Sequence, residues 1–290
     1  MKKISLLIIV ALMVSLLGCS APSENPQIVA TTKPVYDFTS RLCSGTGLVV
    51  GQLITESVSC LHDYSLTVRQ MRNVEAAEVI VISGGGLEEF MEDLLAKKNK
   101  LIDSSLNIPL SYCGEDSEHT HDHAHEADAH FWLSPSHATT MAENIFQGLC
   151  RAYPTHSEIF QSNYIALKKE IEDLQNYGKQ QLSGLAGKEL ITFHDGFGYL
   201  AEEFNLHILR AVEEESGSEA SAKELMELTN LVTEHHIQAI FTERNGSTSA
   251  AEIIARETGI SVYVLNMGMG EGDYFEIMRQ NFDTLKEALG

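Results

Sequence analysis

The stretch EVIVISGGG, residues 78–86, indicates the fold class most directly. Its run of Val and Ile is continuous, which is typical of a strand buried on both faces in a parallel sheet. Helix-like segments lie on either side of it, at 67–77 and 87–98. Strands that alternate with helices predict an α/β fold with a parallel sheet. The glycines lack the GxGxxG spacing and the GK[ST] ending of phosphate-binding loops, so we do not expect nucleotide binding.

The same alternation continues along the chain. Strand-like runs occur in both halves, at 27–32, 48–54, 189–193, 206–212, 237–243 and 261–266. Between the halves, apolar residues at helical spacing predict one amphipathic helix of roughly 25 residues; they are Phe160, Tyr164, Leu167, Ile171 and Leu174.

We therefore predict two α/β lobes, each with a mainly parallel β-sheet flanked by helices and both joined by one long rigid helix. The chain is too long for one typical domain and suits two. The predicted boundaries are 27–153 for the N-terminal lobe, 154–186 for the connecting helix and 187–290 for the C-terminal lobe.

The N-terminus reads as an export signal. Lys2 and Lys3 precede an apolar run at 4–17, which has the length of a signal-peptide core and is shorter than the roughly 20 residues of a membrane span. The sequence LLGC at 16–19 resembles a bacterial lipobox, which implies acylation of Cys19. We expect a lipoprotein signal peptide at 1–18 and a lipid-anchored tether at 19–26. An ordinary secretion signal that contains a cysteine is the alternative.

Acidic residues outnumber basic ones, with 41 Asp and Glu against 20 Lys and Arg, and the formal net charge is −21 at pH 7. Such a charge repels nucleic acids and anionic lipid head groups, so we expect neither as a partner.

Four cysteines remain beyond Cys19, namely Cys43, Cys60, Cys113 and Cys150. Their spacing does not form a CxxC-type zinc framework. One or two disulfides are compatible with an exported protein, and buried free thiols are equally compatible. The sequence does not choose among the three complete pairings.

A histidine-rich stretch, HTHDHAHEADAHFWLSP at 119–135, holds five of the 12 histidines. Its first part belongs to an acidic insertion at 115–126 without apolar periodicity, a composition typical of loops that bind metal weakly. We predict an auxiliary low-affinity metal loop there, formed by His119, His121, His123 and His125. The fifth histidine, His130, instead leads into the apolar run FWL.

Three histidines stand where a strand or extended run gives way to a loop or helix: His62, His130 and His194. Ligands of open α/β sheets gather outside the carboxyl ends of the strands. Imidazole nitrogens from the two lobes could converge there, and they suit zinc. For each histidine alone, a hydrogen-bonded structural role is the stronger interpretation.

The sequence around these histidines resembles the zinc/manganese solute-binding lipoproteins of metal ABC transporters, of the high-affinity zinc-uptake type. The resemblance runs from about residue 27 to the end of the chain. It rests on the stretches LHDY (61–64), GGGLE (84–88), DAHFWLSP (128–135), FHDGFGY (193–199), 240–266 and 272–289.

The resemblance implies that His62, His130 and His194 bind the metal in a cleft between the lobes. Histidine at the third position favours Zn²⁺, whereas glutamate there would suit Mn²⁺. The implied function is an extracytoplasmic receptor, not an enzyme, that delivers Zn²⁺ to an ABC permease and its ATPase. We expect a monomer, lipid-anchored at the outer face of the cytoplasmic membrane or in the periplasm.

The chain departs from the family pattern at two places. Asn266 stands where the family usually has Asp, so the fourth ligand is open among Asn266, Glu243 and water. Cys60 lies two residues before His62 and could join the site as a thiolate, although a disulfide or a buried thiol is the more economical interpretation.

Three alternatives stay open on the sequence. The first is a manganese or mixed zinc/manganese receptor of the same family. The second is a zinc hydrolase, for which Glu243 is the candidate base. The third is a metal-binding adhesin.

Overall fold

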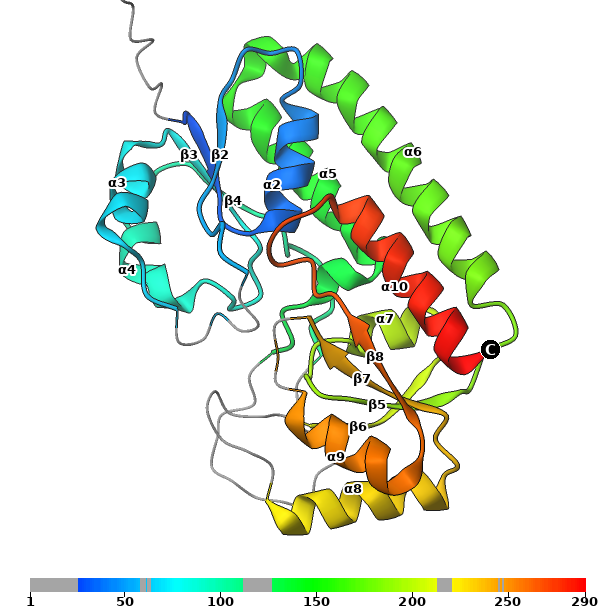
Figure 1. Cartoon of the computed structure of the whole chain (residues 1–290). Helices are drawn as coiled ribbons and strands as arrows, with labels where there is room; N and C mark the ends of the chain where they lie inside the picture. Colours follow the sequence, from blue (N-terminus) through cyan, green and yellow to red (C-terminus); the bar gives the residue numbers. More distant parts are fainter. Residues whose placement is uncertain are drawn as a thin grey trace, which may run out of the picture.

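The computed structural model describes residues 26–57, 61, 64–111, 127–212, 221–244, 246 and 248–290. It contains two lobes, each built on a four-stranded parallel sheet (Figure 1). The sheet order is β2-β1-β3-β4 in the N-terminal lobe and β6-β5-β7-β8 in the C-terminal lobe. The predicted fold class is confirmed.

The strands of the N-terminal sheet are β1 (Ile28–Ala30), β2 (Val50–Gln52), β3 (Val79–Ile82) and β4 (Leu101–Asp103). Those of the C-terminal sheet are β5 (Glu189–Thr192), β6 (His207–Ala211), β7 (Ala239–Glu243) and β8 (Ser261–Leu265). β3 is fully buried, as its uninterrupted Val and Ile run predicted.

Helices cover both sheets. In the first part of the chain they are α2 (Lys33–Leu42), α3 (Val68–Ala76), α4 (Glu92–Leu95) and α5 (Pro135–Ala152). After α6 follow α7 (Gly198–Glu203), α8 (Ala222–Glu234), α9 (Ser249–Thr258) and α10 (Tyr274–Leu289). Local signals set several boundaries: Thr67 with Gln70 and Ser221 with Glu224 form capping boxes, and Gly259 ends α9 in the left-handed conformation.

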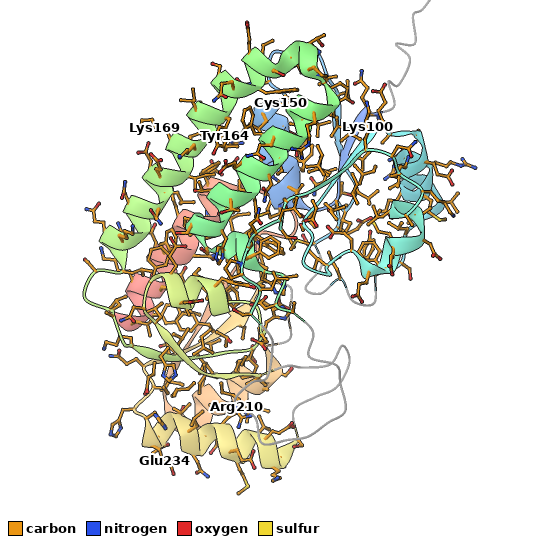
Figure 2. The ribbon with its side chains drawn as sticks, turned by 180° about the vertical axis from the view of Figure 1, so that it is seen from behind. Lys100, Cys150, Tyr164, Lys169, Arg210 and Glu234 are labelled. Atoms are coloured by element: carbon orange, nitrogen blue, oxygen red, sulfur yellow. The ribbon has the colours of Figure 1, made fainter. Side chains whose placement is uncertain are left out.

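Helix α6 (Ser157–Gln181) runs along one side of the molecule from the upper lobe to the lower (Figure 1). It packs against α2 and α5 of the first half and against α10 of the second. Tyr164 faces α5, where its ring stacks on Phe146 with centroids 4.7 Å apart. Lys169 lies on the outer side of the helix, and Figure 2 labels both residues. The apolar stripe of α6 therefore joins the two lobes.

The C-terminal end of α6 approaches the second lobe closely. A Cβ atom at Gly178 would lie 2.6 Å from Cζ of Phe204 and 2.9 Å from Cζ of Phe282. Glycine at this position thus lets the aromatic rings of the C-terminal lobe contact the helix backbone.

Within the described residues, no helix is both long and apolar enough to cross a membrane.

Cys43 is buried and Cys150 is half-buried, and both are free thiols. Burial raises the pKa of the Cys43 thiol to about 12, so this thiol is protonated at neutral pH. Cys60 and Cys113 lie outside the described residues.

The prediction of one continuous helix over 87–98 is wrong. The structure has a short 3₁₀ turn at Glu89–Met91 and then the four-residue helix α4. The side chain of Glu88 instead turns back onto the end of β3. Its carboxyl oxygens accept hydrogen bonds from the Ser83 and Gly84 backbone N–H groups, at 2.8 and 2.9 Å, and from the Thr31 hydroxyl at 2.6 Å.

We predict that the Glu88 carboxyl group titrates near neutral pH in the folded protein. Burial raises its pKa from 4.5 to about 7, and the three hydrogen bonds oppose this shift only in part. A raised folded pKa stabilises the folded state fully at pH values below 4.5, and this contribution is lost as the pH rises through 7. Carbon NMR titration of the metal-free protein, with Glu88→Gln to assign the signal, measures the midpoint. A midpoint near 4.5 would contradict the prediction.

Candidate metal centre

Three of the predicted site residues lie at one edge of the C-terminal sheet. His194 follows β5 by two residues, Glu243 ends β7, and Asn266 directly follows β8. These three strands are neighbours in the sheet and run parallel, so their carboxyl ends meet at the same edge. The register pairs Glu243 with Leu265, which sets Asn266 one step beyond Glu243.

His130 approaches this edge from the other part of the chain. Its Nε2 atom lies 3.5 Å from Nε2 of His194. The ring centroids are 5.1 Å apart and the ring planes cross at 87°. The side chains are 13 % and 18 % exposed, so the pair is largely shielded from solvent. Two imidazole nitrogens from residues 64 positions apart thus face one another.

Asp128 fixes the orientation of His130. Its Oδ1 atom accepts hydrogen bonds from the His130 backbone N–H at 2.9 Å and from ring Nδ1 at 2.8 Å. Because a carboxylate accepts hydrogen bonds, this contact favours the tautomer of His130 with the proton on Nδ1 and the lone pair on Nε2. That lone pair points toward His194. A carboxylate behind an imidazole is the usual second partner of a metal-binding histidine.

Glu243 is the carboxylate that lies beside the Nδ1 atom of His194. Its Oε2 atom is 3.9 Å from Nδ1 of His194, which is an electrostatic contact rather than a hydrogen bond. The Glu243 side chain is only 6 % exposed. A Cβ atom at Gly246 would lie 2.6 Å from Cγ of Glu243, so glycine leaves room for this buried carboxylate.

The backbone of Gly196 lies against both imidazoles. A Cβ atom at this position would be 2.9 Å from Nδ1 of His130, 2.8 Å from Cδ2 of His194 and 2.4 Å from the methyl carbon of Met267. The close packing of the two rings therefore depends on a residue without a side chain. Sequence reasoning missed Gly196 and Asp128, although both lie two residues from a predicted ligand.

Asn266 has its side chain engaged. Its Oδ1 atom accepts a hydrogen bond from the Gly268 backbone N–H at 2.9 Å. Its own backbone forms two bonds with the side chain of Asn281, from the N–H at 2.9 Å and to the carbonyl at 2.8 Å. Asn266 also lines a cavity of about 220 Å³, together with Ser57 of the N-terminal lobe and Arg244, Met269, Gly270 and Glu271.

The other predicted site residues lie outside the described residues: His62, the loop histidines His119, His121, His123 and His125, and Cys19. Across the described part of the chain, no group of three or more His, Cys, Asp and Glu side chains is arranged to hold a metal ion. Tyr64, two residues after His62 in the sequence, donates its hydroxyl to Glu56 and accepts from the Gln70 side chain, at 2.9 and 2.7 Å.

Two further histidines lie away from the centre. His207 and His235 contact the carboxylate of Glu189, at 3.6 and 3.1 Å. Glu189 and His207 begin β5 and β6, so this cluster is at the amino edge of the same sheet. His207 and His235 are therefore suitable control residues, because they are histidines that lie away from the candidate centre.

Comparison with known proteins agrees with the sequence motifs and the fold. The profile of the family described as "Zinc-uptake complex component A periplasmic" (ZnuA) matches residues 28–288. The zinc-binding lipoprotein AdcA of Streptococcus pneumoniae is 31% identical over 308 aligned residues, which cover 99% of this chain and 61% of AdcA. The high-affinity zinc uptake system protein ZnuA of Bacillus subtilis is 30% identical over 296 residues, covering 94% of this chain and 90% of that protein.

A solved structure gives the same result. The Zn(II)-bound ZnuA-like domain of Streptococcus pneumoniae AdcA superimposes with a TM-score of 0.77 at 27% identity, covering 90% of this chain and 98% of that domain. The chain spans 61% of the length of the AdcA lipoprotein that it matches. Because the family profile covers nearly the whole described region, the chain belongs to the family of zinc-uptake complex component A proteins.

Proposed function

We propose that this protein is an extracytoplasmic receptor that captures Zn²⁺ and delivers it to the permease of an ABC importer. His130 and His194 supply two nitrogen ligands, and His62 supplies the third. The family and the described relatives, which include zinc-binding proteins, support this assignment.

The observation that carries the proposal is the separation of the two imidazoles. Tetrahedral zinc with Zn–N bonds of about 2.0–2.1 Å holds two nitrogen ligands about 3.3 to 3.4 Å apart. The Nε2 atoms of His130 and His194 are 3.5 Å apart. A zinc ion would therefore require only a small adjustment of the two rings.

The surrounding charges favour a divalent cation. Neutral imidazoles add no charge to the site, while the side chains of Asp128 and Glu243 are both only 6 % exposed. Two carboxylates at the rear of the imidazoles balance the charge of one Zn²⁺ in a poorly solvated site. Three nitrogen donors favour zinc over manganese, which prefers oxygen. Asn266, Glu243 and water are our candidates for the fourth position, and Glu243 would take it only by turning away from Nδ1 of His194.

The same carboxylates support a receptor rather than a hydrolase. A catalytic zinc site needs a general base that can reach a bound water molecule. Asp128 is occupied by hydrogen bonds to the backbone N–H and the ring of His130, and Glu243 contacts the Nδ1 side of His194.

In our proposal the protein is a monomer, tethered through a lipid on Cys19, and its partners are the permease and ATPase of a zinc importer.

The histidine-rich segment has a separate role in this proposal. His119, His121, His123 and His125 alternate with acidic and small residues at 119–126. They bind Zn²⁺ weakly and raise its local concentration near the cleft. We expect the cleft site to be the tighter one, because the Nε2 atoms of His130 and His194 already face each other at 3.5 Å.

The main prediction concerns the three cleft histidines. Structural zinc sites contribute about 10–16 kcal/mol over four ligands, so losing one ligand should weaken binding about 100-fold or more. We expect this loss for His62→Ala, His130→Ala and His194→Ala in chelator-competition titrations. His207→Ala and His235→Ala, at the opposite edge of the sheet, should leave the affinity unchanged. Full zinc affinity in the triple cleft variant would refute the proposal.

Gly196 provides a second prediction. The Met267 methyl group occupies the space that a Cβ at this position would need. Gly196→Ala should push the two imidazoles apart and weaken zinc binding about tenfold. Gly198→Ala is the matched control, since its Cβ would meet Asp128 Oδ2 at an ordinary 3.5 Å. Equal affinities of the two variants would show that Gly196 does not set the ring positions.

Deletion of residues 115–126 tests the auxiliary loop. The tight site should keep its affinity and one-to-one stoichiometry, whereas the weaker zinc binding should disappear from isothermal titration curves. A full-length variant with all four loop histidines changed to Ser separates the effect of the imidazoles from that of the shortened loop. Loss of the tight site in the Ser variant would contradict two independent sites.

A further inference from the structure

The segment that carries His130 is bonded to the C-terminal lobe on both sides of the histidine. Two residues before it, the carbonyl of Asp128 accepts a hydrogen bond from the Tyr199 hydroxyl at 2.9 Å. Two residues after it, the indole N–H of Trp132 donates to the carbonyl of Met267 at 2.7 Å. Tyr199 lies in α7, five residues after His194 in the sequence, and Met267 directly follows Asn266.

Both bonds lie in the interior. Tyr199 is 2 % exposed and Trp132 is 1 % exposed, so water cannot easily replace either contact. The Tyr199 hydroxyl also accepts the Ser111 backbone N–H at 2.9 Å, and its ring packs against those of Phe131 and His137. A buried polar group held in this way has one low-energy position.

Each bond leads to the two imidazoles through one further residue. On one side, the Asp128 carboxylate holds the ring and the peptide of His130. On the other side, a Cβ atom at Gly196 would meet the methyl group of Met267 and both rings, so these groups converge on this glycine. The 3.5 Å separation of the Nε2 atoms therefore depends on two hydrogen bonds that cross from one lobe to the other.

We propose that Tyr199 and Trp132 are positioning residues that set the separation of His130 and His194 and thereby favour tetrahedral zinc over octahedral manganese. This inference rests on the proposed zinc-receptor function. Tetrahedral bonds of 2.0–2.1 Å place two donors about 3.3 to 3.4 Å apart. Octahedral coordination narrows the angle between neighbouring donors from about 109° to about 90°, which brings the donors closer together at a given bond length. We call the hydrogen bonds of Tyr199 and Trp132 the clamp. Because the clamp resists closer approach of the two nitrogens, it disfavours binding of the octahedral ion.

The Trp132 side of the clamp is itself supported from the C-terminal lobe. The Tyr274 hydroxyl donates to the Trp132 carbonyl at 2.7 Å, and the Tyr274 backbone N–H donates to Asp37 of α2 at 3.0 Å. The ring of Phe38 meets that of Tyr274 edge-on, with centroids 4.9 Å apart. Trp132 is thus held at both its indole and its backbone.

The test compares Tyr199→Phe and Trp132→Phe with the wild-type full chain, using Zn²⁺ and Mn²⁺ as separate probes. Each variant keeps an aromatic ring and removes one hydrogen bond. Zinc affinity should fall about tenfold, while manganese affinity should change less than about twofold because the relaxed pair tolerates closer donors. Cobalt-loaded variants should lose intensity in the visible absorption bands of tetrahedral Co²⁺.

Tyr177→Phe is the matched control, because its hydroxyl donates to Asp283 at 2.6 Å in an exposed contact between α6 and α10. It should alter neither metal affinity nor the cobalt spectrum. Parallel losses of zinc and manganese affinity in the clamp variants would overturn the proposal, and so would unchanged zinc affinity in both. If one variant is too unstable to purify, the other carries the same test.

Different results would refute the positioning role of Tyr199 and Trp132 and the zinc-receptor function. If the wild-type protein binds zinc through His130 and His194 but both clamp variants keep the wild-type ratio of zinc to manganese affinity, only the clamp is refuted. If His130→Ala and His194→Ala leave zinc binding intact, the receptor function itself is wrong.

Discussion

The Nε2 atoms of His130 and His194 lie 3.5 Å apart, and contacts from distant parts of the chain hold them at this separation. His130 and His194 come from segments on different sides of the long helix, and neither can set the distance alone. The carboxylate of Asp128 orients one ring, Glu243 stands behind the other, and Gly196 gives both rings room. In our proposal this arrangement is in place before the ion binds, which reduces the ordering that binding requires.

The fold provides this constraint through parallel strands and a shared helical frame. Both sheets have the same strand order, and in the C-terminal sheet parallel pairing brings the ends of β5, β7 and β8 to one edge. Helix α6 and helix α10 bridge the lobes (Figure 1). Arg41 of α2 adds an ion pair with Asp273 at 2.8 Å, directly before α10. Connections of this kind fix the positions of the two lobes relative to each other.

Sequence patterns predicted the architecture well because they report local periodicity and burial. The Val and Ile run of β3 and the apolar stripe from Phe160 to Leu174 both appear as expected. The segment 87–98 was predicted wrongly, because its helical periodicity could not reveal that the Glu88 carboxyl group binds the end of β3. His130 and His194 were chosen as candidate ligands from their motif contexts, whereas spacing alone favoured a structural role for each.

The two α/β lobes, the connecting helix, the family and the candidate histidines could be predicted from the sequence, since these follow from residue patterns that are local in the chain. Which atoms of those histidines face each other, and what holds them there, depends on the tertiary structure. Tyr199 reaches Asp128 across 71 residues, and Trp132 reaches Met267 across 135. Hydrogen bonds of that sequence separation leave no periodic signal, because they exist only once both lobes have folded and packed together.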